Sequence, residues 1–273
     1  MKRTRRIPDA AGLQLEAALL AGGLRALLLQ LAHPAIGHGV ARHSDFAADP
    51  LARLRGTLIY VYEVAAGDAA TARRVIDRID RLHARVISSP GDAVPYDAAD
   101  PGLQFWVTAT IADTALRIAD TVWGPLPAPL GDELLARLGR IGTELGMPPE
   151  WWPASRSAFD TAFAEAEREL RLDPVTRHVI AELFAARGAP RWVRAALPFL
   201  IAATLPTVPS IRAELEQLPR TTAPNLSALV RPLVPLYRAL PVRLRRLPAT
   251  RLLARARRRT AGPRRPGPVV AET

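Results

Sequence analysis

The residues best suited to chemistry lie close together near the start of the chain. His33, His38 and His43 are three of its five histidines, and the short basic motif RLRGT follows with Arg53 and Thr57. Imidazole and guanidinium groups can hold a metal or cofactor, or donate to an anion. Histidines five residues apart are turned by about 140° from one another around a helix. These three therefore do not form one metal-binding helix face.

A fourth histidine, His83, lies in a more apolar setting. It follows Ile76 and Ile79 by seven and four residues, and Val86 comes three residues later, so the ring projects from an otherwise aliphatic helix face. Such a histidine is buried or half-buried. Taken alone, it is either a core residue satisfied by one hydrogen bond or a ligand.

Arg53, Thr57 and Tyr60 share a second helix face. They stand at positions i, i+4 and i+7 of the helix expected after Asp49-Pro50. A face that carries a guanidinium, a hydroxyl and a phenol is either ordinary surface or one wall of a site.

Several chemistries are excluded by residue type or by spacing. The chain has no cysteine, so it has no disulfide, thiolate nucleophile or zinc–thiolate site, and any metal must be held by histidine, carboxylate or a preformed cofactor. A di-iron carboxylate bundle needs paired Glu-x-x-His motifs, and the chain offers only the single segment 80–83, DRLH. Zincin, P-loop, nucleophile-elbow and dinucleotide motifs are also absent.

The net charge of +11 belongs to the end of the chain. Residues 231–273 hold twelve arginines against Glu272 alone, while residues 1–230 are electrically balanced, and Lys2 is the only lysine. We interpret this end as a solvated basic helix with a Pro-rich tail. No specific nucleic-acid binding is expected, and a peripheral membrane contact through the basic C-terminus stays open.

Residues that cap or end helices predict an all-α single domain. Asp49-Pro50, Asp100-Pro101 and Asp173-Pro174 each place an N-cap before a proline at the first helical position. No alternating β-branched runs and no repeats occur. We expect a basic lead over 1–10, a helical domain over 11–240 and a basic C-terminal helix and tail over 241–273. The expected helices are 11–32, 49–66, 68–88, 100–123, 131–145, 155–171, 173–187, 190–205 and a proline-broken segment over 224–259.

We expect neither a secretion signal nor a membrane-spanning segment in this chain. The segment MKRTRR is a poor secretion signal, because the apolar stretch after it contains Glu16 and Arg25. The most apolar later run, 195–205, is interrupted by Pro198 and is shorter than the ~20 residues needed to span a bilayer. We therefore expect a cytoplasmic protein, with a membrane-peripheral location as the alternative.

One long block resembles a known enzyme family. The stretch ALLLQLAHPAIGHGVARHSDFAADPLARLRGTL, followed by RRVIDRIDRLHARV and VPYDAADPGLQFWVTATI, is similar to the family of the MpaB oxygenase and the latex clearing protein, a rubber oxygenase. This resemblance implies a globin-like helical core that holds one haem b. It also implies dioxygen or peroxide chemistry on an apolar small molecule, including oxidative attack on a C=C bond.

The same resemblance suggests roles for individual residues. It makes His83 the proximal iron ligand and Arg53 and Thr57 the catalytic residues on the distal side. The remaining candidates for cofactor contact, as walls of the haem pocket, are His33, His38, His43 and Trp106.

Two positions depart from the family pattern. The rubber oxygenase has a lysine just before its motif threonine, where this chain has Gly56, so capping of the iron by lysine is absent. We therefore expect the sixth site of the iron to be empty or to hold water, with His38 or His43 as the alternative sixth ligand. Thr108 stands where the family commonly has histidine, which puts a proton relay there in doubt.

Three functions remain open from the sequence. The leading one is a haem-dependent oxygenase. The second is a non-catalytic protein that binds haem or an apolar ligand, because fold does not imply function. The third is an interaction protein that binds through its basic C-terminus.

Overall fold

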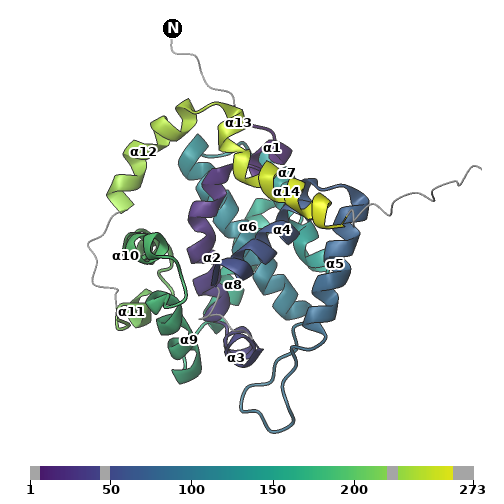
Figure 1. Ribbon diagram of the computed structural model, residues 1–273, viewed down its shortest axis with the longest axis vertical. Helices are drawn as coiled ribbons and strands as arrows, with labels where there is room; N and C mark the ends of the chain where they lie inside the picture. Colours follow the sequence, from purple (N-terminus) through teal and green to yellow (C-terminus); the bar gives the residue numbers. More distant parts are fainter. Residues whose placement is uncertain (1–6, 44–49, 220–226, 261–273) are drawn as a thin grey trace, which may run out of the picture.

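The computed structural model describes residues 7–43, 50–219 and 227–260, and over these ranges the protein is an all-α single domain (Figure 1). Within them the only β-type pairing is an isolated bridge between Ile87 and Asp97. The α-helices are α1 (Ala10–Gln14), α2 (Gly23–Leu31), α3 (Pro34–His43), α4 (Pro50–Ala66), α5 (Ala69–His83), α6 (Pro101–Trp123), α7 (Ala128–Thr143), α8 (Arg156–Ala166), α9 (Pro174–Ala185), α10 (Arg191–Thr204), α11 (Arg212–Leu215), α12 (Ser227–Ala239), α13 (Val242–Arg245) and α14 (Leu247–Thr260). The 3-10 helices are η1 (Ala17–Gly22), η2 (Pro149–Trp151), η3 (Glu167–Glu169) and η4 (Leu205–Thr207).

The predicted helix starts are confirmed where a capping aspartate is described. Asp100 accepts hydrogen bonds from the backbone nitrogens of Gly102 and Leu103, and α6 begins at the next residue, Pro101. Asp173 accepts from Thr176 at the start of α9 in the same way. The prediction at Asp49 lies outside the described residues, although α4 does begin at Pro50.

Two predicted boundaries at the start of the chain are wrong. The helix expected over 11–32 is broken at Glu16, whose backbone is extended and which precedes η1. The chain also forms a helix that was not predicted, α3, which begins at Pro34, three residues after α2 ends at Leu31. Proline is as well suited to the first turn of a new helix as to ending the previous one.

Helix α6 is the central element and packs against both α2 and α7 (Figure 1). Its buried face includes Ala109, Ala112 and Ala119, whose small side chains let neighbouring helices come close. At Gly142 on α7, a Cβ atom would lie only 2.6 Å from the hydroxyl of Thr108. Close helix contact therefore leaves little room for a larger side chain at this crossing.

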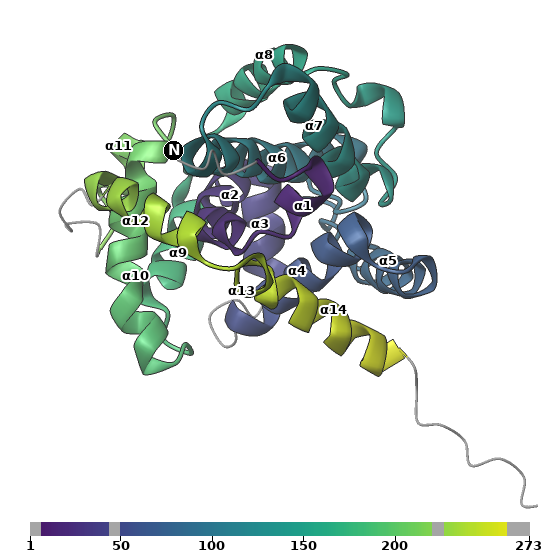
Figure 2. The ribbon, with the colours of Figure 1, turned by 90° about the horizontal axis from the view of Figure 1, so that it is seen from above.

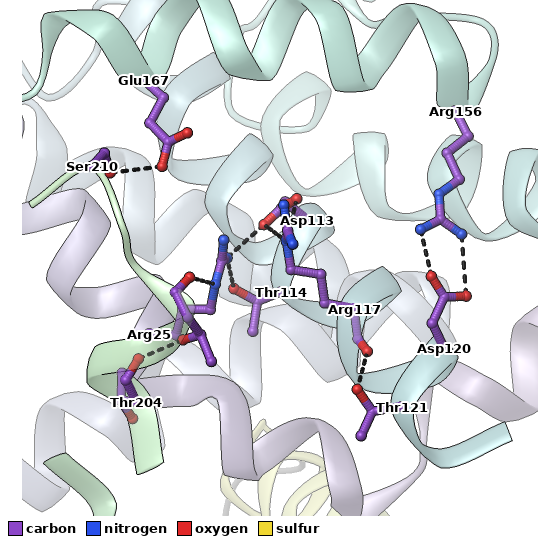
Figure 3. A network of polar contacts seen from close by, with 11 residues as sticks. Arg25, Asp113, Thr114, Arg117, Asp120, Thr121, Arg156, Glu167, Thr204 and Ser210 are labelled. Atoms are coloured by element: carbon purple, nitrogen blue, oxygen red, sulfur yellow. Dashed lines mark hydrogen bonds and ion pairs between the residues drawn. The ribbon is translucent and has the colours of Figure 1, made fainter. Parts of the chain in front are cut away.

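A buried ion pair ties α2 to α6 (Figure 3). The guanidinium of Arg25 lies 2.6 Å from the carboxylate of Asp113 and donates to the hydroxyl of Thr114 at 2.8 Å. Its Nε donates to the carbonyl of Thr207, which brings in η4. Burial lowers the pKa of Arg25, and the attraction of Asp113 opposes that shift. Arg25 thus joins three segments far apart in the sequence.

The basic C-terminal helix is not solvated along its whole length, contrary to our interpretation of the sequence. Ala249 and Leu253 of α14 pack against Tyr62 of α4 in a small second core. Figure 2 shows α12, α13 and α14 following one another as one band across the near side of the helical body. This packing requires apolar residues every third or fourth position, which a net charge does not reveal.

Within the described residues, no single helix is long and apolar enough to cross a bilayer. One bent pair, Ala17–Leu31 with Pro34–His43, has the required length and composition, with an angle of 100° at its break.

Candidate functional site

His83 is the last residue of α5 and lies half-buried there. The helix is capped by Asp68 and ends five residues earlier than predicted, so Val86 falls in the following loop. Nδ1 of His83 lies 3.2 Å from the side-chain amide nitrogen of Gln104 on α6. The imidazole is thus positioned by a neighbouring helix as well as by its own.

Gln104 is a site residue that the sequence analysis missed. It is buried, and its amide nitrogen also donates to the carbonyl of Ala98 in the loop before α6. One side chain therefore connects α5, this loop and α6. The available signal was its place one helical turn after Asp100, the predicted N-cap of α6.

The RLRGT motif lies on an exposed part of α4. Leu54 and Thr57 are exposed, and a Cβ atom added at Gly56 would meet no atom within 4 Å. The side chain of Arg53 lies outside the described residues, although its backbone belongs to α4. Among the described residues, there is therefore open space at Gly56.

Tyr60 does not share the exposed setting of the RLRGT motif, although its spacing predicted that it lies on the same helix face. It is buried, and its hydroxyl donates to the carbonyl of Ile141 on α7 at 2.5 Å. Burial, assisted by the nearby carboxylates of Glu144 and Asp80, raises its pKa above the ordinary value. Tyr60 thus anchors the inner half of α4 to the body of the protein.

The three clustered histidines have different environments. Nε2 of His38 lies 2.7 Å from the carboxylate of Asp173, and Nε2 of His43 lies 3.1 Å from the hydroxyl of Tyr96. Burial alone would raise the pKa of Asp173, but hydrogen bonds from Thr176 and His38 lower it below its usual range.

His33 lies between α2 and α3 with Nδ1 buried and without a hydrogen-bond partner among the described residues. Burial lowers the pKa of His33, so its ring is neutral at neutral pH. A neutral histidine retains an acceptor nitrogen, which a bound group or a water molecule can use.

Trp106 and Thr108 lie on the buried side of α6. Trp106 donates from Nε1 to the carbonyl of Leu29 at 3.2 Å and stacks on Phe163. Thr108 donates to the carbonyl of Gln104 at 2.7 Å and faces the close crossing with α7 at Gly142. The small residue at position 108 therefore suits the packing of these two helices.

Over the described ranges, no group of three or more His, Asp or Glu side chains is arranged to hold a bare metal ion. A haem needs only one axial ligand from the protein. A metal-binding imidazole normally donates its other ring N–H to an acceptor, whereas the group beside Nδ1 of His83 is the amide nitrogen of Gln104, which is a donor.

The comparison with protein families identifies the relationship. The family described as ER-bound oxygenase mpaB/B′ and rubber oxygenase, catalytic domain, matches residues 12–240. The chain belongs to this family. Membership confirms the resemblance read from the sequence and places the protein among oxygenase catalytic domains.

Two curated relatives are similar to part of the chain. The uncharacterized proteins Mb2261 of Mycobacterium bovis and Rv2237 of Mycobacterium tuberculosis are each 30% identical over 158 residues. The match covers 56% of this chain and 62% of each relative, so the chain spans less than two thirds of their length. No solved structure matches the chain. The globin-like core and the predicted domain bounds stay predictions.

Proposed function

We propose that this domain is a haem b-dependent oxygenase that oxidises an apolar small molecule with dioxygen or peroxide. The observation that carries the proposal is the setting of His83 within a family of oxygenase domains: a half-buried imidazole whose Nδ1 lies against the buried amide of Gln104. The chain has no cysteine, so neither a thiolate ligand nor a thioether attachment competes with histidine.

Gln104 is the polar side chain that lies beside the proposed ligand. Binding of iron through Nε2 leaves the ring proton on Nδ1, which then needs an acceptor. The amide nitrogen of Gln104 now faces Nδ1 and also donates to the carbonyl of Ala98, so its oxygen would reach Nδ1 only if the amide turned and gave up the hydrogen bond to Ala98. His83 would hold the iron in this arrangement, and Gln104 would hold His83.

Arg53 and Thr57 are proposed to act on the other side of the cofactor. Bound haem would supply the site at which dioxygen or peroxide is activated. One turn apart on α4, the guanidinium and the hydroxyl can donate hydrogen bonds to one point, where they would stabilise negative charge that develops on the oxidant. The open space at Gly56 leaves room for a ligand next to this part of α4. Oxidative attack on a C=C bond is the reaction we propose.

A non-catalytic protein that binds haem or an apolar ligand is the second candidate. Gly56 and Thr108 favour this candidate, because the rubber oxygenase has a lysine in place of Gly56 and the family commonly has a histidine in place of Thr108. Turnover with dioxygen or peroxide separates the two functions.

The cofactor is tested first. Protein expressed with ample haem should contain about one haem b per chain in a pyridine haemochrome assay. His83→Ala should lose most of the haem, and imidazole should partly restore the Soret band in His83→Gly. His178→Ala is the control, since His178 is exposed on α9. A Soret band that persists in His83→Ala but disappears in His33→Ala or His43→Ala would show that another histidine is the ligand.

A further inference from the structure

Exposed apolar side chains are concentrated on the last helices of the domain. Of twelve large hydrophobic residues that are exposed among the described residues, eight belong to α10, α12, the joint after it and α13. Soluble monomers rarely gather so many on adjoining elements without a partner. This concentration needs an explanation that the proposed haem chemistry does not provide.

On α10, the apolar residues form an outward stripe. Trp192 and Phe199 are two turns apart and are 70% and 63% exposed. The opposite face of the helix, with Leu197 and Ile201, is buried in the main core. The helix is therefore anchored by one apolar face and presents a second one to the outside.

Helix α12 repeats this arrangement. Leu233 and Leu236 of α12 and Leu240, the residue directly after it, follow at spacings of three and four residues, and all three are exposed. Tyr237, on the inward side, donates to the buried carboxylate of Glu16. Helices α10 and α12 pack together, so the two outward stripes belong to adjoining elements (Figures 1 and 2).

Exposed arginines lie on α14, which follows α12 and α13 along the chain. Arg251, Arg255 and Arg258 are exposed at i, i+4 and i+7 of α14, opposite its buried residues. None of them has an ion-pair partner among the described residues, whereas Arg257 pairs with Asp68. The sequence contains no acidic residue from 217 to 260 or from 183 to 213. The apolar stripes and the arginines are thus free of neighbouring carboxylates on their own elements.

We infer that α10, α12, α13 and α14 form a docking surface for an anionic lipid bilayer. Exposed Trp, Phe and Leu side chains enter the interface between headgroups and acyl chains, while arginines attract anionic headgroups. Nucleic acid explains the arginines but not the leucines, which cannot stack on bases. A second copy of the chain would bring cations against cations. This inference goes beyond the proposed oxygenase function and does not depend on haem.

Vesicle sedimentation tests the inference on the full chain. The protein should bind vesicles of phosphatidylcholine with about one third phosphatidylserine, and binding should weaken with added salt and be much lower on pure phosphatidylcholine. Trp192→Glu should weaken binding about tenfold or more. The triple variant Arg251→Gln, Arg255→Gln, Arg258→Gln should weaken it roughly a hundredfold, at roughly fivefold for each arginine.

Matched variants control for charge and hydrophobicity. Arg74, Arg78 and Arg81 are exposed on α5 with the same spacing as the α14 arginines, and their replacement by glutamine should leave binding unchanged. Trp151→Glu, at an exposed tryptophan of η2, is the control for Trp192→Glu. Thermal melting shows that each variant folds.

Three outcomes overturn the inference. The first is equal loss of vesicle binding in the matched controls. The second is that the protein binds duplex DNA or RNA but not vesicles, and that Trp192→Glu does not affect this nucleic-acid binding. Such a result would assign the arginines to nucleic acid. The third is a dimer that Leu236→Glu abolishes, without vesicle binding, which would make this surface an interface between copies.

Discussion

Single residues from Leu54 to Thr57 in the RLRGT motif can be changed without opening a cavity in the core. Leu54 to Thr57 are exposed on α4, whereas the packed half of the helix begins at Tyr60. Exposed substitutions away from special features usually change stability by about 0.5 kcal/mol or less. Variants at positions 54 to 57 therefore report on chemistry rather than on folding.

Arg53→Ala and Thr57→Val should keep the haem spectrum and lose activity. If both groups stabilise charge that develops on the oxidant, loss of either donor should slow turnover by roughly 10²–10³-fold. Arg55→Ala is the control, because Arg55 is exposed on the same helix about 200° around from Arg53. Turnover at the normal rate in either variant would remove that residue from the mechanism.

At the scale of elements, buried polar contacts fix how α2 meets its neighbours. Arg25 and Asp113 are both about 6% exposed, so neither charge has water to replace its partner. Arg117 also binds Asp113, but its own side chain is 60% exposed. The two arginines thus allow a comparison of a buried and an exposed ion pair at one carboxylate (Figure 3).

Asp113→Asn should lower the free energy of unfolding by about 3–5 kcal/mol, because it leaves Arg25 buried without a counter-charge. Arg117→Ala should cost only about 0–1 kcal/mol. Urea unfolding followed by circular dichroism measures both. Equal, small losses in the two variants would show that Arg25 finds solvent or another partner.

His33, between α2 and α3, should make the stability of the haem-free protein sensitive to mild acid. Burial lowers the pKa of His33, so the unfolded chain binds a proton more readily than the folded one. The contribution of neutral His33 to the free energy of unfolding is therefore fully present above the ordinary histidine pKa of about 6.5. It is lost as pH falls through the lower pKa of the folded protein.

His33→Gln should remove this contribution, while His178→Gln, at an exposed histidine, should keep it. Unfolding free energies measured between about pH 7.5 and pH 5 should decline less steeply in His33→Gln than in the wild type, by at most about 1.4 kcal/mol per pH unit. Parallel curves for the two proteins would mean that His33 does not titrate differently on folding.

At the scale of the whole molecule, a segment near the start of the described chain packs against one near its end. Glu16, which is 1% exposed, lies 3.6 Å from Arg245 and accepts a hydrogen bond from Tyr237. Arg246 also lies 3.6 Å from Glu16, and Arg245 stacks over the ring of Trp123. An arginine of the basic C-terminus is thus a structural part of the domain.

Arg245→Ala should destabilise the protein by about 2–4 kcal/mol, which is near the lower end of the cost of breaking a buried ion pair because Arg246 remains. Arg243→Ala, at an exposed arginine two residues earlier, should have little effect. Thermal unfolding at fixed ionic strength compares them. Similar melting temperatures for the two variants would contradict a structural role for Arg245.

The sequence by itself determined the helical class, most helix starts and the half-buried setting of His83. These features depend on local chemistry: an aspartate before proline caps a helix, and apolar residues repeat with the helical period. The order of residues in its first half also sufficed to reveal the family. The role of His83 as an iron ligand stays a prediction from that relationship.

Only the tertiary structure decided which groups meet across distant segments. It brings Gln104 to His83 across 21 residues, gives His38 a partner in Asp173, and buries Arg245 beside Glu16. It also breaks the first predicted helix at Glu16, where a long-range polar contact replaces local helix propensity. Such contacts leave no periodic signal, because their free energy depends on burial and on partners that local sequence does not specify.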